Sequence, residues 1–313
     1  DEHIIIAECP TGLIQNFTVE HLGAADPNTE PTCVFLINSS VSVKSCKLSS
    51  KNGHGVRLKE SPGLIENCFI ENCGRNGINA GGKGTNAIIR NCTSKGCWNG
   101  ILFCYRSKGT IENRIWNDNK KAGILATQPV TELNITASAC SGNKYGILYS
   151  DEASGKVENN TCDNSEFSGI SIINNKTEVT VKDNYSFENT KNGILFINCS
   201  GLIEGNLCQN NKGAGIIVAK KVEDVTVKNN RCLKNKQGVV ILKGATVLVE
   251  SNVAQQNKFS GFAAYSADTN VTFKENQSRM NSKDGICIWE NATGVVENNT
   301  CEQNLRHGIK IDD

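Results

Sequence analysis

Apolar residues alternate with polar ones in short segments of this chain, and the pattern returns every 22 to 24 residues. A glycine followed by a large apolar residue opens each repeat, as in Gly169-Ile170-Ser171-Ile172. The residue after the glycine and the residue two places further on point the same way in a strand, so both columns should line an interior. A period this short predicts one supersecondary unit stacked many times. The glycines are Gly55, Gly77, Gly100, Gly123, Gly146, Gly169, Gly193, Gly215, Gly238, Gly261, Gly285 and Gly308.

Each repeat contains a second strand signal that ends in Asn. Its apolar anchors supply a third interior column: Ile65, Ile89, Ile111, Ile135, Val157, Val181, Ile203, Val227, Val249, Phe273 and Val296. Three residues after the anchor, seven successive repeats carry Asn160, Asn184, Asn206, Asn230, Asn252, Asn276 and Asn299. A stacked Asn can bond its amide to the turns on either side, so a buried polar side chain is satisfied along the stack.

A second set of Asn residues stands four places before the glycine: Asn119, Asn189, Asn211, Asn257, Asn281 and Asn304. We expect these residues at another turn, where Asn tolerates left-handed backbone and the glycine permits a sharp corner.

A column of charges tests this alignment independently. The residue after each second-strand anchor should face solvent, and its sign alternates with one neutral break: Lys44, Glu66, Arg90, Glu112, Thr136, Glu158, Lys182, Glu204, Lys228, Glu250, Lys274 and Glu297. In a parallel stack with a spacing of about 4.8 Å, each charge lies between two opposite charges. A slip by one turn brings like charges together, so the column should specify register.

The motif Val-Glu-Asn-Asn-Thr-Cys…Asn…Gly-Ile-x-Ile, at 157–172 and 296–311, resembles the consensus of right-handed parallel β-helix repeat proteins. The resemblance extends from about Gly12 to the end and implies an all-β fold, a single-stranded parallel β-helix of about 13 turns. The family includes pectate lyases, polygalacturonases, alginate epimerases, a periplasmic group serving copper enzymes and the β-helices of F-box adaptors. The motif is specific for the fold but indicates little about which function the protein has.

We expect residues 1–313 to form one β-helix domain excised from a longer chain. The one long insertion, residues 23–32, replaces a tight turn and should form an N-terminal cap, although an inserted functional loop is the alternative.

Composition limits the partners and the compartment. With 33 basic and 32 acidic residues the net charge is +1, which disfavours nucleic acid and anionic membranes as partners. No apolar run approaches the ~20 residues of a membrane span. The odd number of cysteines, 15, and the sequons at Asn184 and Asn276, where the side chain should be buried, favour a cytoplasmic or nuclear, reducing location. Bacterial export remains open.

Outward positions on the strand after the glycine hold no Asp, Glu or His before Asp312, so a glycosidase carboxylate pair or an acidic calcium cluster cannot form there. We therefore assign no catalytic residue and no cofactor. Lyases can use Lys and Arg as acid and base, and Arg106, Lys220 and Lys243 keep that alternative open.

The same outward positions form an apolar stripe, which we hypothesise to bind a protein partner. A covering loop or segment is the alternative. A non-enzymatic scaffold or substrate-recognition module is thus the first functional hypothesis, and a polysaccharide lyase or other carbohydrate-active enzyme is the second. The stripe consists of Leu102, Leu125, Leu148, Ile173, Leu195, Ile197, Ile217, Val240, Leu242, Tyr265 and Trp289.

Several cysteines share turn columns. Cys46, Cys68 and Cys92 occupy one column, while Cys73 and Cys97 occupy another. Thiolates in such pairs are zinc ligands in other proteins, but stacked side chains run parallel and do not converge on a tetrahedral centre. We therefore interpret the cysteines as packing residues and predict no metal site.

Overall fold

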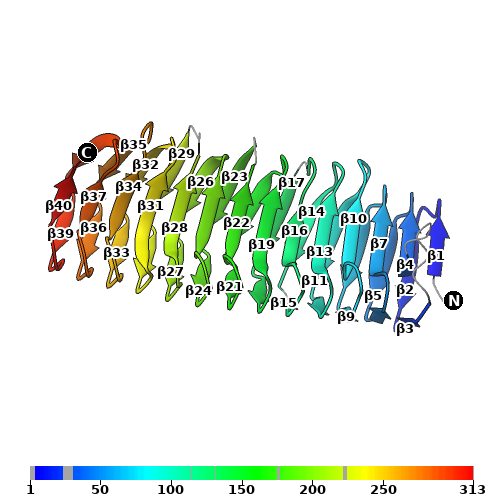
Figure 1. The fold of residues 1–313 in the computed structure, drawn as a ribbon. Coiled ribbons are helices and arrows are strands. Elements are labelled where there is room, and N and C mark those ends of the chain that lie inside the picture. The colour runs from blue at the N-terminus through cyan, green and yellow to red at the C-terminus, as the bar shows by residue number, and fades with distance from the viewer. Residues whose placement is uncertain are drawn as a thin grey trace. The chain divides into compact units, whose positions relative to one another are not determined.

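The computed structural model describes residues 4–23, 31–113, 115–130, 132–174, 177–220 and 224–312, and none of these residues lies in a helix. The chain divides into two compact units, residues 1–156 and 157–313. In each unit three parallel sheets, here called A, B and C, form a right-handed β-solenoid (Figure 1). The predicted fold class is confirmed. Residues 24–30 of the expected cap lie outside the described residues.

In the first unit each sheet takes one strand from every turn. Sheet A contains β1 (Ile4–Ala7), β4 (Thr32–Ile37), β7 (His54–Lys59), β10 (Ile78–Gly81), β13 (Asn99–Cys104), β16 (Ala122–Ala126) and β19 (Tyr145–Ser150). Sheet B contains β2 (Gly12–Gln15), β5 (Val41–Lys44), β8 (Gly63–Glu66), β11 (Asn86–Arg90), β14 (Lys108–Glu112) and β17 (Glu132–Thr136). Sheet C contains β3 (Thr18–His21), β6 (Lys47–Ser50), β9 (Phe69–Glu71), β12 (Thr93–Lys95), β15 (Ile115–Asn117) and β18 (Ala139–Ser141).

The second unit repeats this arrangement after β20 (Gly155–Glu158). Sheet A contains β22 (Ile170–Ile173), β25 (Ile194–Ile197), β28 (Ala214–Ala219), β31 (Gln237–Leu242), β34 (Phe262–Tyr265), β37 (Ile286–Ile288) and β40 (Ile309–Ile311). Sheet B contains β23 (Glu178–Lys182), β26 (Ser200–Glu204), β29 (Val225–Lys228), β32 (Thr246–Glu250), β35 (Asn270–Lys274) and β38 (Thr293–Glu297). Sheet C contains β21 (Thr161–Asp163), β24 (Tyr185–Phe187), β27 (Leu207–Gln209), β30 (Arg231–Leu233), β33 (Val253–Gln255), β36 (Gln277–Arg279) and β39 (Thr300–Glu302).

The predicted interior columns are buried except in the last turn, where Ile309 and Ile311 are exposed, and each turn holds three strands where the sequence pattern predicted two. Ile78, Ile101 and Ile124 of sheet A are fully buried, as are Ile65 and Ile89 of sheet B. The additional strands form sheet C and are mostly three residues long, which is too short for apolar alternation to reveal them. In the second unit their central positions pair Ser186 with Cys208, Cys208 with Cys232, and Cys232 with Ala254, which fits the expected packing role of small side chains.

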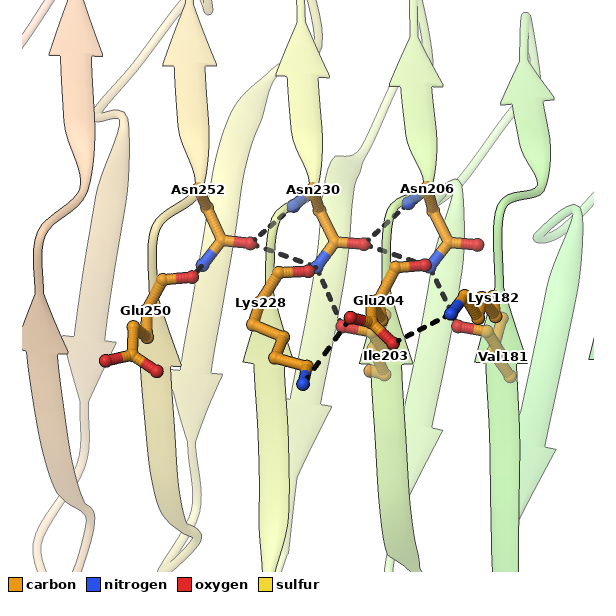
Figure 2. A network of polar contacts seen from close by, with 9 residues as sticks. All are labelled: Val181, Lys182, Ile203, Glu204, Asn206, Lys228, Asn230, Glu250 and Asn252. Carbon is orange, nitrogen blue, oxygen red and sulfur yellow. Dashed lines mark hydrogen bonds and ion pairs between the residues drawn. The ribbon is translucent and has the colours of Figure 1, made fainter.

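The Asn ladder is confirmed in the second unit (Figure 2). The side-chain amide of Asn230 donates to the carbonyl oxygen of Ile203 at 2.8 Å and to Oδ1 of Asn252 at 2.9 Å. Asn206 in turn donates to Oδ1 of Asn230 at 2.9 Å. Asn206, Asn230 and Asn252 are buried, so their amides are satisfied by the protein itself and not by water.

A second ladder lies at the later turn and has more members than the sequence predicted. The backbone nitrogen of Asn119 donates to Oδ1 of Asn143 at 2.9 Å, and that of Asn211 donates to Oδ1 of Asn235 at 2.9 Å. Asn143 and Asn235 escaped the sequence pattern because they precede their glycines by three residues and not four.

The expected backbone roles of Asn and glycine at these turns are wrong. The left-handed residue is the one before each ladder Asn, as at Asn229 (φ 56°) and Gln256 (φ 56°). Gly238 does not have positive φ; a Cβ there would lie 2.1 Å from the carbonyl oxygen of Gly261. The repeated glycine therefore allows close approach of successive turns and does not form a left-handed corner.

The charge column is confirmed as an ion-pair ladder within each unit. Glu204 lies between Lys182 and Lys228, with nitrogen to oxygen distances of 3.3 and 3.4 Å (Figure 2). Strand register places Glu204 opposite both lysines, and Lys228 opposite Glu250. The charge column therefore favours the observed strand register, as the alternation of sign predicted.

Candidate functional site

The outer face of sheet A in the first unit carries a hollow of about 550 Å³. Its floor consists of Arg57, Asn79, Leu102 and Leu125, one from each of β7, β10, β13 and β16. Register pairs Arg57 with Asn79, Asn79 with Leu102, and Leu102 with Leu125. The floor is thus a single outward column across four successive turns.

The two ends of strand β13 each place an aromatic side chain at this hollow. Trp98 directly precedes β13 and is 49% exposed, while Tyr105 directly follows it and is 62% exposed. A strand of this length separates them by roughly 20 Å. Exposed aromatic rings on both margins, with Leu102 between them, give the hollow flat apolar surfaces for a ring-shaped ligand.

Cationic side chains occupy the margin on which Trp98 lies. The backbone nitrogen of Trp98 donates to the carbonyl oxygen of Arg75 at 2.8 Å, and that of Lys121 donates to the carbonyl oxygen of Trp98 at 2.8 Å. These three residues therefore stack on consecutive turns, and all three line the hollow. The lining therefore has three cationic side chains, those of Arg57, Arg75 and Lys121. No Asp or Glu is among the described residues that line the hollow. Such a lining attracts anionic ligands.

A smaller hollow of about 260 Å³ adjoins the first and shares Arg57, Asn79, Cys104 and Tyr105 with it. Glu60 lines this second hollow. It is the one carboxylate among the described residues that line either hollow, so a pair of carboxylates for glycoside hydrolysis is not formed here. We call the two hollows together the groove.

The guanidinium of Arg57 lies over the ring of Phe35, 4.7 Å from its centroid. This contact holds Arg57 in the groove floor by a cation–π interaction. At the opposite end of the hollow, Thr127 donates from its hydroxyl to Asp151 at 2.8 Å. Both contacts fix polar groups of the lining in place.

The residues of the predicted apolar stripe face outward, but the stripe is less exposed than the sequence suggested. Leu125, Leu148 and Val240 are buried, at 4, 8 and 2% exposed. Side chains on neighbouring turns cover one another at the spacing of a parallel sheet. The other members are half-buried: Leu102, Ile173, Leu195, Ile197, Ile217, Leu242, Tyr265 and Trp289. Leu102 and Leu125 belong to the groove floor.

The basic residues proposed for a lyase do not form this site. Arg106, Lys220 and Lys243 are exposed, and none of them lines the groove. The repeat pattern does not reveal Trp98 and Tyr105, because it marks positions in strands and both residues lie in turns. Trp98 stands two residues before the repeat glycine Gly100. A large aromatic residue at such a turn position is the sequence signal that could have identified it.

The described residues contain no group of three or more His, Cys, Asp or Glu side chains that could hold a metal ion. Within the same part of the chain there is no helix with the length and apolar character that a bilayer span requires.

The model of the right-handed β-helix region matches residues 3–151, 99–232, 129–278 and 217–313. The chain belongs to this family of right-handed β-helix proteins, as the repeat consensus implied. No curated protein matches the chain.

Solved structures of low sequence identity share the fold. The periplasmic alginate epimerase AlgG has a TM-score of 0.69 and 13% identity over 85% of this chain and 76% of its own. The A-module of the Azotobacter vinelandii mannuronan C-5 epimerase AlgE4 has a TM-score of 0.60 and 16% identity over 91% of this chain and 89% of its own. A GH87 α-1,3-glucanase from Streptomyces thermodiastaticus has a TM-score of 0.66 and 15% identity over 95% of this chain and 63% of its own. At such identities the likeness shows the fold alone.

Proposed function

We propose that the groove of the first unit binds a polysaccharide that carries carboxylate or sulfate groups. The observation that carries the proposal is the combination of Trp98 and Tyr105 with three cationic side chains around one hollow that extends over four turns. Sugar rings present apolar faces that pack on aromatic rings, and Arg57 can pair with a carboxylate or sulfate through two parallel hydrogen bonds.

The similar structures support a carbohydrate ligand, because two of them are epimerases of alginate or mannuronan and a third is a glucanase. This fits the alternative hypothesis of the sequence analysis better than the first. The scaffold hypothesis depended on an exposed apolar stripe, and burial of Leu125, Leu148 and Val240 leaves that stripe without a continuous exposed surface.

Binding of defined oligosaccharides tests the proposal. Isothermal titration with oligomannuronate, oligogalacturonate and a neutral α-1,3-glucan oligomer should show binding of at least one acidic oligomer, weakened by salt, and weak or no binding of the neutral one. Trp98→Ala should weaken that binding about tenfold or more, because a buried aromatic contact contributes about 2 kcal/mol.

Trp289→Ala is the matched control, because Trp289 lies in the second unit and does not line the groove. It should leave the affinity unchanged. Equal affinities of the two variants, or failure of every acidic oligomer to bind, would refute the proposal. Ultraviolet absorbance of new unsaturated ends, followed in the same samples, reports whether binding is accompanied by lyase turnover.

A further inference from the structure

Cys73 and Cys97 occupy the same position on consecutive turns of the first unit. Each stands two residues after a strand of sheet C, and the strand ends Glu71 and Lys95 are register partners. The backbone nitrogen of Cys73 lies 3.4 Å from Sγ of Cys97. Neighbouring parallel strands are about 4.8 Å apart, which is within the range of about 4.4 to 6.8 Å found between the Cα atoms of disulfide-bonded cysteines. Both residues are thiols in this structure.

The sulfur of Cys97 accepts two hydrogen bonds and donates one, to the carbonyl oxygen of Lys95 at 3.6 Å. It accepts from the backbone N–H of Cys73 and from the hydroxyl of Ser94, each at 3.4 Å. Donors of this kind stabilise a thiolate. Hydrogen bonding from the Cys73 side chain, above all, and from Ser94 lowers the pKa of the Cys97 thiol to about 7, although burial opposes the shift.

A hollow on the outside of sheet C reaches Cys73, the partner of Cys97 on the preceding turn. The hollow has a volume of about 580 Å³, and Cys73 lines it together with Lys51 and Lys120. Cys73 is 1% exposed and Cys97 is fully buried, so a small oxidant is required. The lining also includes Lys47 and the carboxylates of Glu20 and Glu71, and the charge of Glu71 opposes the lowering of the Cys97 pKa.

We propose that Cys73 and Cys97 form a reversible oxidation site, at which a hydroperoxide converts the two thiols into a disulfide. The Cys97 thiolate attacks one peroxide oxygen, the O–O bond breaks, and hydroxide leaves and takes a proton from solvent. The Cys73 thiol then attacks the sulfenic sulfur of Cys97, and its proton leaves with the hydroxyl group as water. With hydrogen peroxide, two electrons pass from the thiols to the oxidant and two waters form.

The pair stands directly beside one margin of the groove. Cys97 precedes Trp98, and Cys73 stands two residues before Arg75. A disulfide would fix the spacing of the turns that carry these two side chains, so oxidation should change glycan affinity. This consequence rests on the proposed function, whereas formation of the disulfide does not.

Differential alkylation with mass spectrometry tests the site in the whole native chain. After exposure to hydrogen peroxide at neutral pH, peptides containing Cys73 and Cys97 should be recovered as a linked pair that dithiothreitol releases. The reaction should slow several-fold when the pH is lowered from 8 to 6, because the thiolate is the nucleophile. Ser94→Ala should slow it as well, since the variant loses a hydroxyl donor to Cys97.

Cys208 and Cys232 provide a matched control within the same protein. They are register partners on β27 and β30, both are buried, and neither lines the hollow that reaches Cys73. Burial raises the pKa of the Cys208 thiol well above its usual range. This pair should stay reduced under conditions that oxidise Cys73 and Cys97. Oxidation of both pairs at the same rate, or of Cys73 and Cys97 only in denaturant, would overturn the proposal.

Two further readouts separate this site from the proposed function. In Cys73→Ser, treatment with hydrogen peroxide, removal of the peroxide and unfolding in the presence of dimedone should label the sulfenic acid of Cys97, and absence of the adduct would count against the thiolate role. A disulfide that forms in a protein without glycan affinity in either redox state refutes the proposed function alone. Glycan binding by a protein that forms no disulfide refutes the oxidation site alone.

Discussion

The side chain of Asn230 hydrogen-bonds to its own turn and to the turns on either side, where Asn206 and Asn252 are its partners. Its amide donates to the carbonyl oxygens of Ile203 at 2.8 Å and Lys228 at 2.9 Å, while its Oδ1 accepts from the backbone N–H and the amide of Asn206, each at 2.9 Å. All these groups lie inside the second unit, where water does not replace a lost partner.

Asn230→Ala should therefore lower the free energy of unfolding of the second unit by about 3 kcal/mol, because it leaves several buried polar groups without partners. Urea unfolding followed by circular dichroism measures the change. The neighbouring Arg231→Ala removes an exposed side chain and should stay within about 0.5 kcal/mol of the wild type. Equal losses in the two variants would contradict the role of the ladder.

At the scale of elements, Glu66 of β8 connects three strands of sheet B. It pairs with Arg90 of β11 and with Lys44 of β5, the latter at 3.2 Å. Hydrogen bonding to Arg90, and then to Lys44, lowers the pKa of the Glu66 carboxyl below its ordinary value of 4.5. A carboxyl with a lowered pKa in the folded state stabilises the fold above the unfolded-state pKa. That contribution is lost as the pH falls through the folded-state pKa.

The stability of the first unit should consequently decline as the pH falls below about 4.5, and Glu66→Gln should reduce this decline. Urea midpoints measured between pH 3 and pH 6 test the expectation. Glu132→Gln, which changes an exposed carboxylate at the start of β17, should leave the slope nearly unchanged. An identical pH slope for Glu66→Gln and the wild type would mean that protonation of Glu66 is not coupled to unfolding.

At the scale of the whole molecule, the charge ladder makes the effect of a deletion depend on the number of turns removed. Removal of residues 205–228 from the second unit joins Glu204 to Asn229 and brings Glu204 next to Glu250. Removal of residues 205–250 takes out two turns and brings Glu204 next to Lys274. Both deletions keep an Asn at the ladder position, as Asn230 or Asn252 replaces Asn206.

At low salt the shorter deletion should therefore lose about 1 kcal/mol through the Glu204–Glu250 contact in addition to the loss of its turn, and the longer deletion should not. Urea midpoints at low and high ionic strength measure the difference, which should shrink as salt screens the charges. Glu250→Gln in the shorter deletion should recover most of the loss. A shorter deletion whose stability gains no more from added salt than that of the longer one would show that the charges do not select register.

The sequence predicted most of this fold because each turn repeats the same demands on its residues. A column such as Ile78, Ile101 and Ile124 signals its burial many times over. The groove is different, since Trp98 and Tyr105 occur once each and lie in turns that no period constrains. The depth of burial of Leu148 also escaped the sequence, because it depends on how closely adjacent turns pack, which residue spacing does not report.

Alternation of charge also bears on how such a protein can grow by gene duplication. A column of outward residues of sheet B in the second unit has the same period of two turns, because Thr alternates with Leu. Its members are Thr180, Leu202, Thr226, Leu248 and Thr272. A duplicated segment of one turn interrupts both the alternation of charge and the alternation of Thr with Leu, whereas a duplicated pair of turns preserves both. Duplication or loss of a pair of turns should therefore be tolerated better than duplication or loss of a single turn.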